Sequence, residues 1–91
     1  RPVPPALDGV LEREYPREAR AQGIAGSALL RVQILPDGSV RVRRRISETE
    51  SGFGDACERA LKGARFTPAL DRGGRPVRTE ISYRCTFEIR S

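Results

Sequence analysis

The sequence predicts an α+β fold: a three-stranded antiparallel sheet with a main helix packed on one face and a short N-terminal helix. Three observations point to this fold class. Residues 27–35 and 39–47 alternate between apolar and polar side chains across a tight turn, and residues 77–89 alternate strictly. Residues 53–64 place their apolar side chains on one helical face. A chain of 91 residues suits one domain.

The N-terminal residues 1–5 include three prolines. Proline fixes φ and pushes its neighbour out of the helical region, so residues 1–10 are expected to be the end of an extended linker. The domain itself is then expected to span residues 11–91.

Residues 11–21 have helical character that Tyr15-Pro16 interrupts. Because proline suits the first turn of a helix, a short helix is expected at residues 17–21. Gly23 and Gly26 end it before the first strand.

The first strand, residues 27–35, leads into the turn Pro36-Asp37-Gly38, where proline presets one φ and glycine supplies a positive one. In the return strand, residues 39–47, one face carries Val40, Val42 and Ile46, and the other carries Arg41, Arg43 and Arg45. Arg44 breaks this alternation, which predicts a bulge or a strand end there.

The main helix, residues 53–64, has one apolar stripe, made of Phe53, Cys57, Ala60, Leu61 and Ala64. Acidic residues lie early in it and basic residues late, as the helix dipole favours. Pro68 ends the helical region, and residues 71–76 form a turn before the last strand.

The core is predicted to combine the helix stripe with the apolar faces of the strands: Leu30, Val32, Ile34, Val40, Phe53, Leu61, Ile81, Tyr83 and Phe87. Tyr15 and Tyr83 are expected at the core edge, with hydroxyls that reach water.

Composition argues against enzyme chemistry. The chain has no histidine, so histidine-based acid–base catalysis and nucleophile activation are excluded. Two cysteines without histidine do not make a zinc site, and no glycine-rich phosphate loop occurs, so no metal or cofactor is expected.

The net charge of +5 comes almost entirely from arginine. The densest run is Arg41-Val42-Arg43-Arg44-Arg45, which is interpreted as a solvated sheet face that Arg31 could join. Contact with an acidic protein or an anionic lipid is the alternative. No aromatic side chain lies on this face for base stacking, so no nucleic-acid partner is expected.

Four motifs in this order and spacing resemble the C-terminal domain of the TonB family over roughly residues 12–90. They are Tyr15-Pro16-Arg17-Glu18-Ala19 followed by Gly23-Ile24-Ala25-Gly26, Pro36-Asp37-Gly38-Ser39-Val40, Phe53 to Ala69 with its exit Arg65-Phe66-Thr67-Pro68-Ala69, and Gly74-Arg75-Pro76-Val77.

The sequence departs from the family pattern in three places. Gly54 replaces a usual acidic residue, Ala64 stands where a bulky aromatic is common, and Arg13-Glu14 replaces a glutamine-rich stretch that helps contact the receptor. The last departure weakens any assignment to the usual receptors.

The resemblance implies a non-enzymatic periplasmic module at the end of an inner-membrane-anchored bacterial protein. Family members pair with an extended segment of an outer-membrane transporter and transmit force from proton-driven inner-membrane motor proteins, which they reach through their N-terminal part. The alternative is a coupling or scaffold module of another envelope machine, for motility or secretion. Homodimer formation stays open.

The resemblance also places Cys57 and Cys85 in the oxidising periplasm. Both lie on faces that meet when the helix packs on the sheet, so a disulfide is one outcome, and two buried thiols acting as small apolar side chains are the other.

In the family, the last strand receives the partner. We therefore expect it to be a sheet edge that accepts an extended peptide by strand addition. The predicted partner-binding residues are Tyr15, Pro16, Arg78, Glu80, Ser82, Arg84, Thr86 and Glu88. The competing site is the arginine-rich face of the hairpin.

Overall fold

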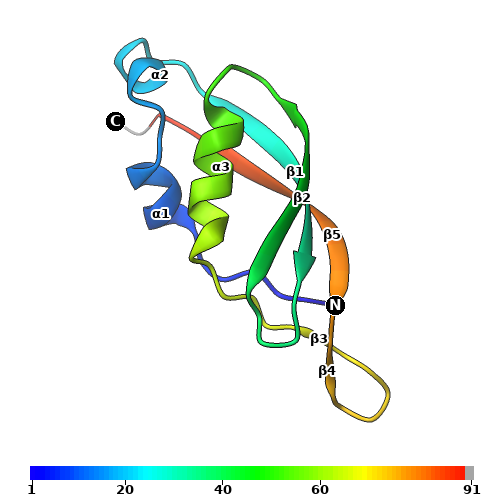
Figure 1. Cartoon of the computed structure of the whole chain (residues 1–91). Helices are drawn as coiled ribbons and strands as arrows, with labels where there is room; N and C mark the ends of the chain where they lie inside the picture. The colour runs from blue at the N-terminus through cyan, green and yellow to red at the C-terminus, as the bar shows by residue number, and fades with distance from the viewer. Residues whose placement is uncertain (90–91) are drawn as a thin grey trace.

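The computed structural model describes residues 1–89, and Figure 1 shows the order of its elements. The helices and strands are α1 (Asp8–Arg13), α2 (Arg17–Ala21), β1 (Gly26–Ile34), β2 (Val40–Glu48), α3 (Phe53–Lys62), β3 (Ala69–Leu70), β4 (Pro76–Val77) and β5 (Thr79–Phe87).

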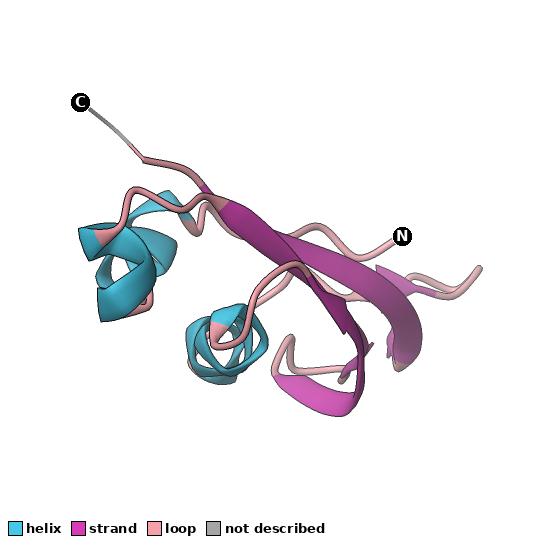
Figure 2. Cartoon of the chain, turned by 90° about the horizontal axis from the view of Figure 1, so that it is seen from above, coloured by secondary structure: helices cyan, strands magenta, loops and turns pink. Residues whose placement is uncertain are grey.

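Strands β2, β1 and β5 form one antiparallel sheet in that order. Figure 2 shows α3 against one face of this sheet, with α1 and α2 on the same side. The predicted fold class is confirmed, although two short helices precede the sheet instead of one. Tyr15 and Pro16 separate them, because the proline ring fits the start of α2 but not the interior of a continuous helix.

The core lies between α3 and the apolar face of the sheet. Six of the nine predicted core residues are fully or almost fully buried: Leu30, Val32, Ile34, Phe53, Leu61 and Phe87. The other three, Val40, Ile81 and Tyr83, pack against this core while remaining partly exposed. They lie on β2 and β5, the two outer strands of the sheet, and in the described part of the chain each of these strands has a neighbouring strand on one side only.

Strand β2 contains two bulges, at which Ile46 and Arg43 are the extra residues. The irregularity predicted from Arg44 is therefore confirmed. Between the bulges, the register sets Arg45 opposite Leu30, whose side chain is buried on the helix face. Directly paired residues share a sheet face, so Arg45 faces α3.

This bulged register corrects two expectations from simple alternation. Arg45 does not share the outer face with Arg41 and Arg43; Arg44 takes its place, because it pairs with the outer-face residue Arg31. Ile46, expected to point inward, is instead 38% exposed.

The last strand is shorter than the predicted span. Pro76 and Val77 pair with β3 in a separate two-stranded ladder, and the main strand begins at Thr79. The predicted partner-contact residue Arg78 thus lies between β4 and β5, outside the main sheet.

The proline-rich N-terminal residues contact the folded chain. The N–H of Val3 donates to the carbonyl of Thr67 and the reverse bond also forms, both at 2.8 Å. Leu7 is buried in the core. The domain boundary at residue 11 stays a prediction, and these contacts show that ordered packing begins before it.

Candidate functional site at the free edge of the sheet

Strand β5 is an edge strand, because within residues 1–89 it pairs only with β1. The pairing runs without a register shift from Gly26 opposite Phe87 to Ile34 opposite Thr79. One side of β5 is therefore a regular row of main-chain groups with no strand beside it.

Hydrogen bonds at both ends of β1 show which groups form that row. Toward β2, the N–H of Ser27 donates to Thr49 Oγ1 and the N–H of Thr49 to the carbonyl of Ser27, both at 2.9 Å. The N–H of Leu35 likewise donates to the carbonyl of Ser39. Main-chain groups of successive strand residues point to opposite sides, so the even-numbered residues of β1 face β5.

The even-numbered residues of β1 pair with the odd-numbered residues of β5, which must therefore point their main-chain groups back toward β1. The N–H and carbonyl groups that face outward belong to the even-numbered residues of β5, namely Glu80, Ser82, Arg84 and Thr86. All four are predicted partner-binding residues, and their side chains are exposed.

The side chains of this row lie on the face of the sheet away from α3, where polar contacts fix several of them. Arg31 of β1 forms a 2.9 Å ion pair with Glu80 and donates a 3.2 Å hydrogen bond to Ser82. The hydrogen bond from Arg31, with a smaller contribution from nearby Arg43, lowers the pKa of Glu80. Arg31 is thus paired and adds little free charge to the arginine-rich face.

Of the other predicted contact residues, Arg78 precedes β5, whereas Tyr15 and Glu88 lie near its C-terminal end. Glu88 directly follows the strand and is exposed, whereas Pro16 is half-buried in the link between α1 and α2. Tyr15 is only 7% exposed, and its ring packs edge-on against Phe53 and Phe87 with centroids 5.9 and 5.6 Å away.

The tyrosine hydroxyl also corrects an expectation. The hydroxyl of Tyr15 does not point into water but donates to the carbonyl of Ile24. This bond ties the segment before α2 to the segment after it, which gives Tyr15 a structural role in holding the Tyr-Pro link against the end of β5.

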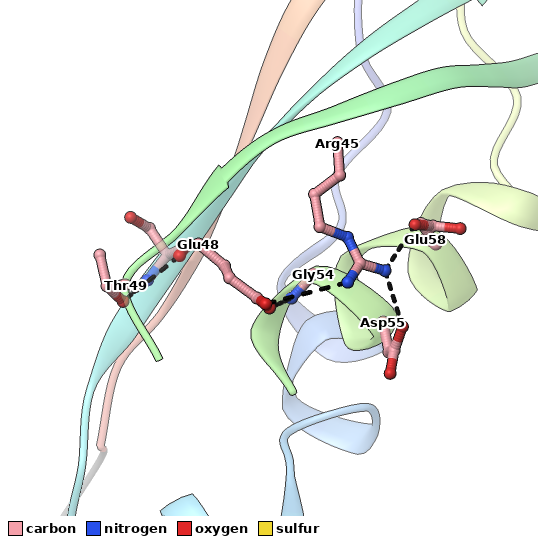
Figure 3. Close-up of polar contacts among 7 residues, drawn as sticks. Arg45, Glu48, Thr49, Gly54, Asp55 and Glu58 are labelled. Carbon is pink, nitrogen blue, oxygen red and sulfur yellow. Dashed lines mark hydrogen bonds and ion pairs between the residues drawn. The ribbon is translucent and has the colours of Figure 1, made fainter. Parts of the chain in front are cut away.

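A cluster around Arg45 attaches α3 to β2 (Figure 3). The guanidinium lies 2.6 Å from carboxylate oxygens of both Asp55 and Glu58, and these hydrogen bonds raise the pKa of Arg45. Glu48 accepts a 2.8 Å hydrogen bond from the N–H of Gly54 in the first turn of the helix, where the dipole favours a carboxylate.

Gly54 is the residue that makes room for this cluster. A Cβ atom at Gly54 would overlap the guanidinium and Cδ of Arg45. In the sequence, Gly54 is a departure from the family pattern and Arg44 is a break in the alternation, and nothing in the sequence connects the two. The bulge connects them, because it turns Arg45 toward the glycine.

We predict that Gly54→Ala and Arg45→Ala are coupled by about 1–2 kcal/mol in the free energy of unfolding. With Arg45 present, the new methyl group displaces the guanidinium from its carboxylates. With Arg45→Ala, the same substitution gains helix propensity of up to about 1 kcal/mol. Urea denaturation of the two single variants and the double variant measures the coupling.

The matched control for that cycle is Gly63→Ala, because Gly63 has open space around it and a negative φ. Its effect is expected to be the same with Arg45 or alanine at position 45. Additive effects of Gly54→Ala and Arg45→Ala would show that the glycine does not accommodate the arginine.

Cys57 and Cys85 are joined by a disulfide, with an S–S distance of 2.09 Å and a Cα–Cα distance of 5.7 Å. Both residues are fully buried. The bond connects α3 to β5, so the edge strand has a covalent attachment to the helix in addition to its ladder with β1.

Two further properties concern the described part of the chain. No group of three or more side chains there is arranged to hold a metal ion. The longest helix has ten residues, too short to cross a bilayer.

Comparisons with known proteins place this geometry in a family. Residues 12–89 match the family described as Gram-negative bacterial TonB protein C-terminal. The fold is similar to the solution NMR structure of the Pseudomonas aeruginosa TonB C-terminal domain, with a TM-score of 0.65 and 26% sequence identity over 99% of this chain and 88% of that chain. No curated protein matched the sequence.

Proposed function

The chain belongs to the family of Gram-negative bacterial TonB C-terminal domains, and from this premise we propose that it binds an extended segment of a partner protein by strand addition to β5. The binding is non-enzymatic. The domain acts in the periplasm as the distal part of an energy transducer that links proton-driven inner-membrane motor proteins to an outer-membrane transporter.

The observation that carries this proposal is the outward row of main-chain groups from Glu80 to Thr86. A partner strand can bond to all of them without breaking a bond of the free domain. Exposed charges on β5 reduce unwanted pairing of such an edge, and Glu80 and Arg84 provide them here.

The arginine-rich outer face of β2 supports the competing site less well. Bulges disfavour strand addition at the β2 edge, since they interrupt the regular spacing of main-chain groups. Arg45 is committed to Asp55 and Glu58. The exposed arginines available to a partner on this face are Arg41, Arg43 and Arg44.

We predict that Ser82→Pro weakens binding of the partner segment about tenfold or more, because it removes an outward N–H donor. Ser82→Ala keeps that N–H and is the matched control, with affinity expected to stay within about twofold of the original. Peptides from the periplasmic ends of the source organism's outer-membrane transporters serve as probes, and calorimetry measures affinity.

A second pair of variants separates the two candidate sites. Arg84→Pro removes another outward donor, whereas changing Arg41, Arg43 and Arg44 together to glutamine leaves the β5 edge intact. If both proline variants fold and bind normally while the triple change abolishes binding, strand addition at β5 is wrong.

Amide hydrogen exchange tests the same proposal without mutation. In the free domain, the amides of Ser82 and Arg84 are expected to exchange fast, while those of Ile81 and Tyr83 are protected by the ladder with β1. Bound peptide should protect the first pair. Unchanged exchange at Ser82 and Arg84 in a saturated complex would place the partner elsewhere.

A further inference from the structure

A cleft of about 230 Å³ lies between α1 and the C-terminal half of β5. Its apolar lining comes from Leu11 on α1, Tyr15 in the link to α2, and Tyr83 and Phe87 on the inward face of β5. The cleft is thus on the helix side of the sheet, directly beside the edge at which strand addition is proposed.

Carboxylates dominate the polar lining. Asp8, Glu12 and Glu88 approach the cleft from α1 and from the end of β5. Asp8 already has an interaction within the chain. Burial of Tyr83, together with the nearby charge of Asp8, raises the pKa of Tyr83. Glu12 and Glu88 are exposed side chains whose carboxylates add negative charge to opposite walls.

The basic residue of the lining does not cancel this charge inside the cleft. The guanidinium of Arg84 donates to the hydroxyl of Ser27, which lies on the face of the sheet away from α1. The lining therefore combines an apolar part with a rim that carries three carboxylates. Beside it, the guanidinium of Arg20 lies over the ring of Tyr15 and donates to the main-chain carbonyl of Glu12, while the carboxylate of Glu12 remains exposed.

Strand geometry determines what enters it. An added strand alternates its side chains between the two sheet faces, so those beside Tyr83 and Phe87 point toward α1. Resting on the proposed function of strand addition, we propose that the cleft is a specificity subsite that takes a lysine or arginine side chain of the partner segment. The aliphatic stem lies on the partly exposed side chains of Leu11 and Tyr83, and the charged head meets Glu12 and Glu88.

The experiment uses a displayed library of random peptides of about ten residues, selected for binding to the oxidised domain. Selected peptides should carry lysine or arginine at one fixed position. Replacing that residue with glutamate in the best synthetic peptide should weaken binding about tenfold or more, and replacing it with norleucine should weaken it less.

Domain variants connect this preference to the cleft. In the double variant Glu12→Gln and Glu88→Gln, the basic peptide and the norleucine peptide should bind with about equal affinity. In the double variant Glu12→Lys and Glu88→Lys, the glutamate peptide should bind more tightly than the basic peptide. The matched control is Glu18→Gln with Glu50→Gln, which removes the same charge from exposed positions outside the cleft lining. It should leave the preference unchanged.

The outcomes separate this subsite from strand addition itself. Peptides that lose affinity with Ser82→Pro yet show no basic preference would overturn the subsite and leave strand addition standing. Peptides indifferent to Ser82→Pro would overturn both. A basic preference that falls equally in the control and cleft variants would reflect net charge, and would also overturn the subsite.

Discussion

Replacing Leu61 with alanine is expected to lower the free energy of unfolding by about 2–5 kcal/mol. Leu61 is fully buried where α3 packs on the sheet. Truncation removes apolar surface from the core and leaves a cavity, which α3 cannot close freely because Cys57 holds it to β5. Urea denaturation with an unchanged m-value would measure the loss as a change in stability alone.

Leu70→Ala is the matched control, since Leu70 is 60% exposed. Its effect is expected to stay within about 0.5 kcal/mol. A loss below about 1 kcal/mol for Leu61→Ala would mean that the apolar stripe of α3 does not face the sheet, and the arrangement of the core would have to be revised.

The elements that the sequence predicted well are those in which apolar periodicity and turn chemistry agree. The turn Pro36-Asp37-Gly38 fixes the hairpin, and strict alternation after Thr79 defines β5. The apolar stripe from Phe53 to Leu61 can then pack on only one face of the sheet, the apolar one. Each local pattern is consistent with the same packing, so the fold class follows from residue types alone.

Prediction failed where register departs from simple alternation. A bulge moves every later side chain to the other face, so the two bulges of β2 turn Arg45 inward and Ile46 outward. Arg44 signalled an irregularity, but the position of the extra residue depends on which side chains α3 accepts. Here Gly54 leaves space for the guanidinium of Arg45, and Asp55 and Glu58 form ion pairs with it.

The candidate site shows the same division. Alternation identified the exposed side chains of β5, but alternation alone cannot tell whether their amides face the neighbouring strand or solvent. That direction depends on pairing, and Ser27 with Thr49 reveals it at the far edge of β1. The cleft beside α1 could not be predicted from the sequence, because it depends on how the link between α1 and α2 packs Tyr15 against Phe87.

Breaking the disulfide between Cys57 and Cys85 is expected to lower the free energy of unfolding by about 3–4 kcal/mol. The two residues are 28 positions apart, so the bond restricts a sizeable loop in the unfolded chain. For a domain with about 5–15 kcal/mol of total stability, this is a large fraction. Denaturation of the oxidised protein, compared with the same protein in a reducing agent, measures the effect without changing the composition of the core.

The loss should also affect the binding edge. Within residues 1–89, strand β5 pairs with β1 on one side only, so the disulfide is its covalent attachment to the rest of the fold. In the reduced protein, the ladder amides of Tyr83 and Cys85 should therefore exchange faster.

Mass spectrometry after alkylation without reduction tests whether the disulfide is present, and it should find no modified cysteine in periplasmic material.

The double substitution Cys57→Ala and Cys85→Ala gives an independent comparison. It removes the bond together with two buried sulfur atoms, so its stability should be lower than that of the reduced protein by a further cavity contribution. If reduction and double substitution each cost less than about 1 kcal/mol, the bond does not restrict the unfolded chain as the loop-entropy argument requires. In that case the stability of the edge strand would come from the β1 ladder and the packing of Phe87 against Phe53, whose ring centroids are 5.1 Å apart.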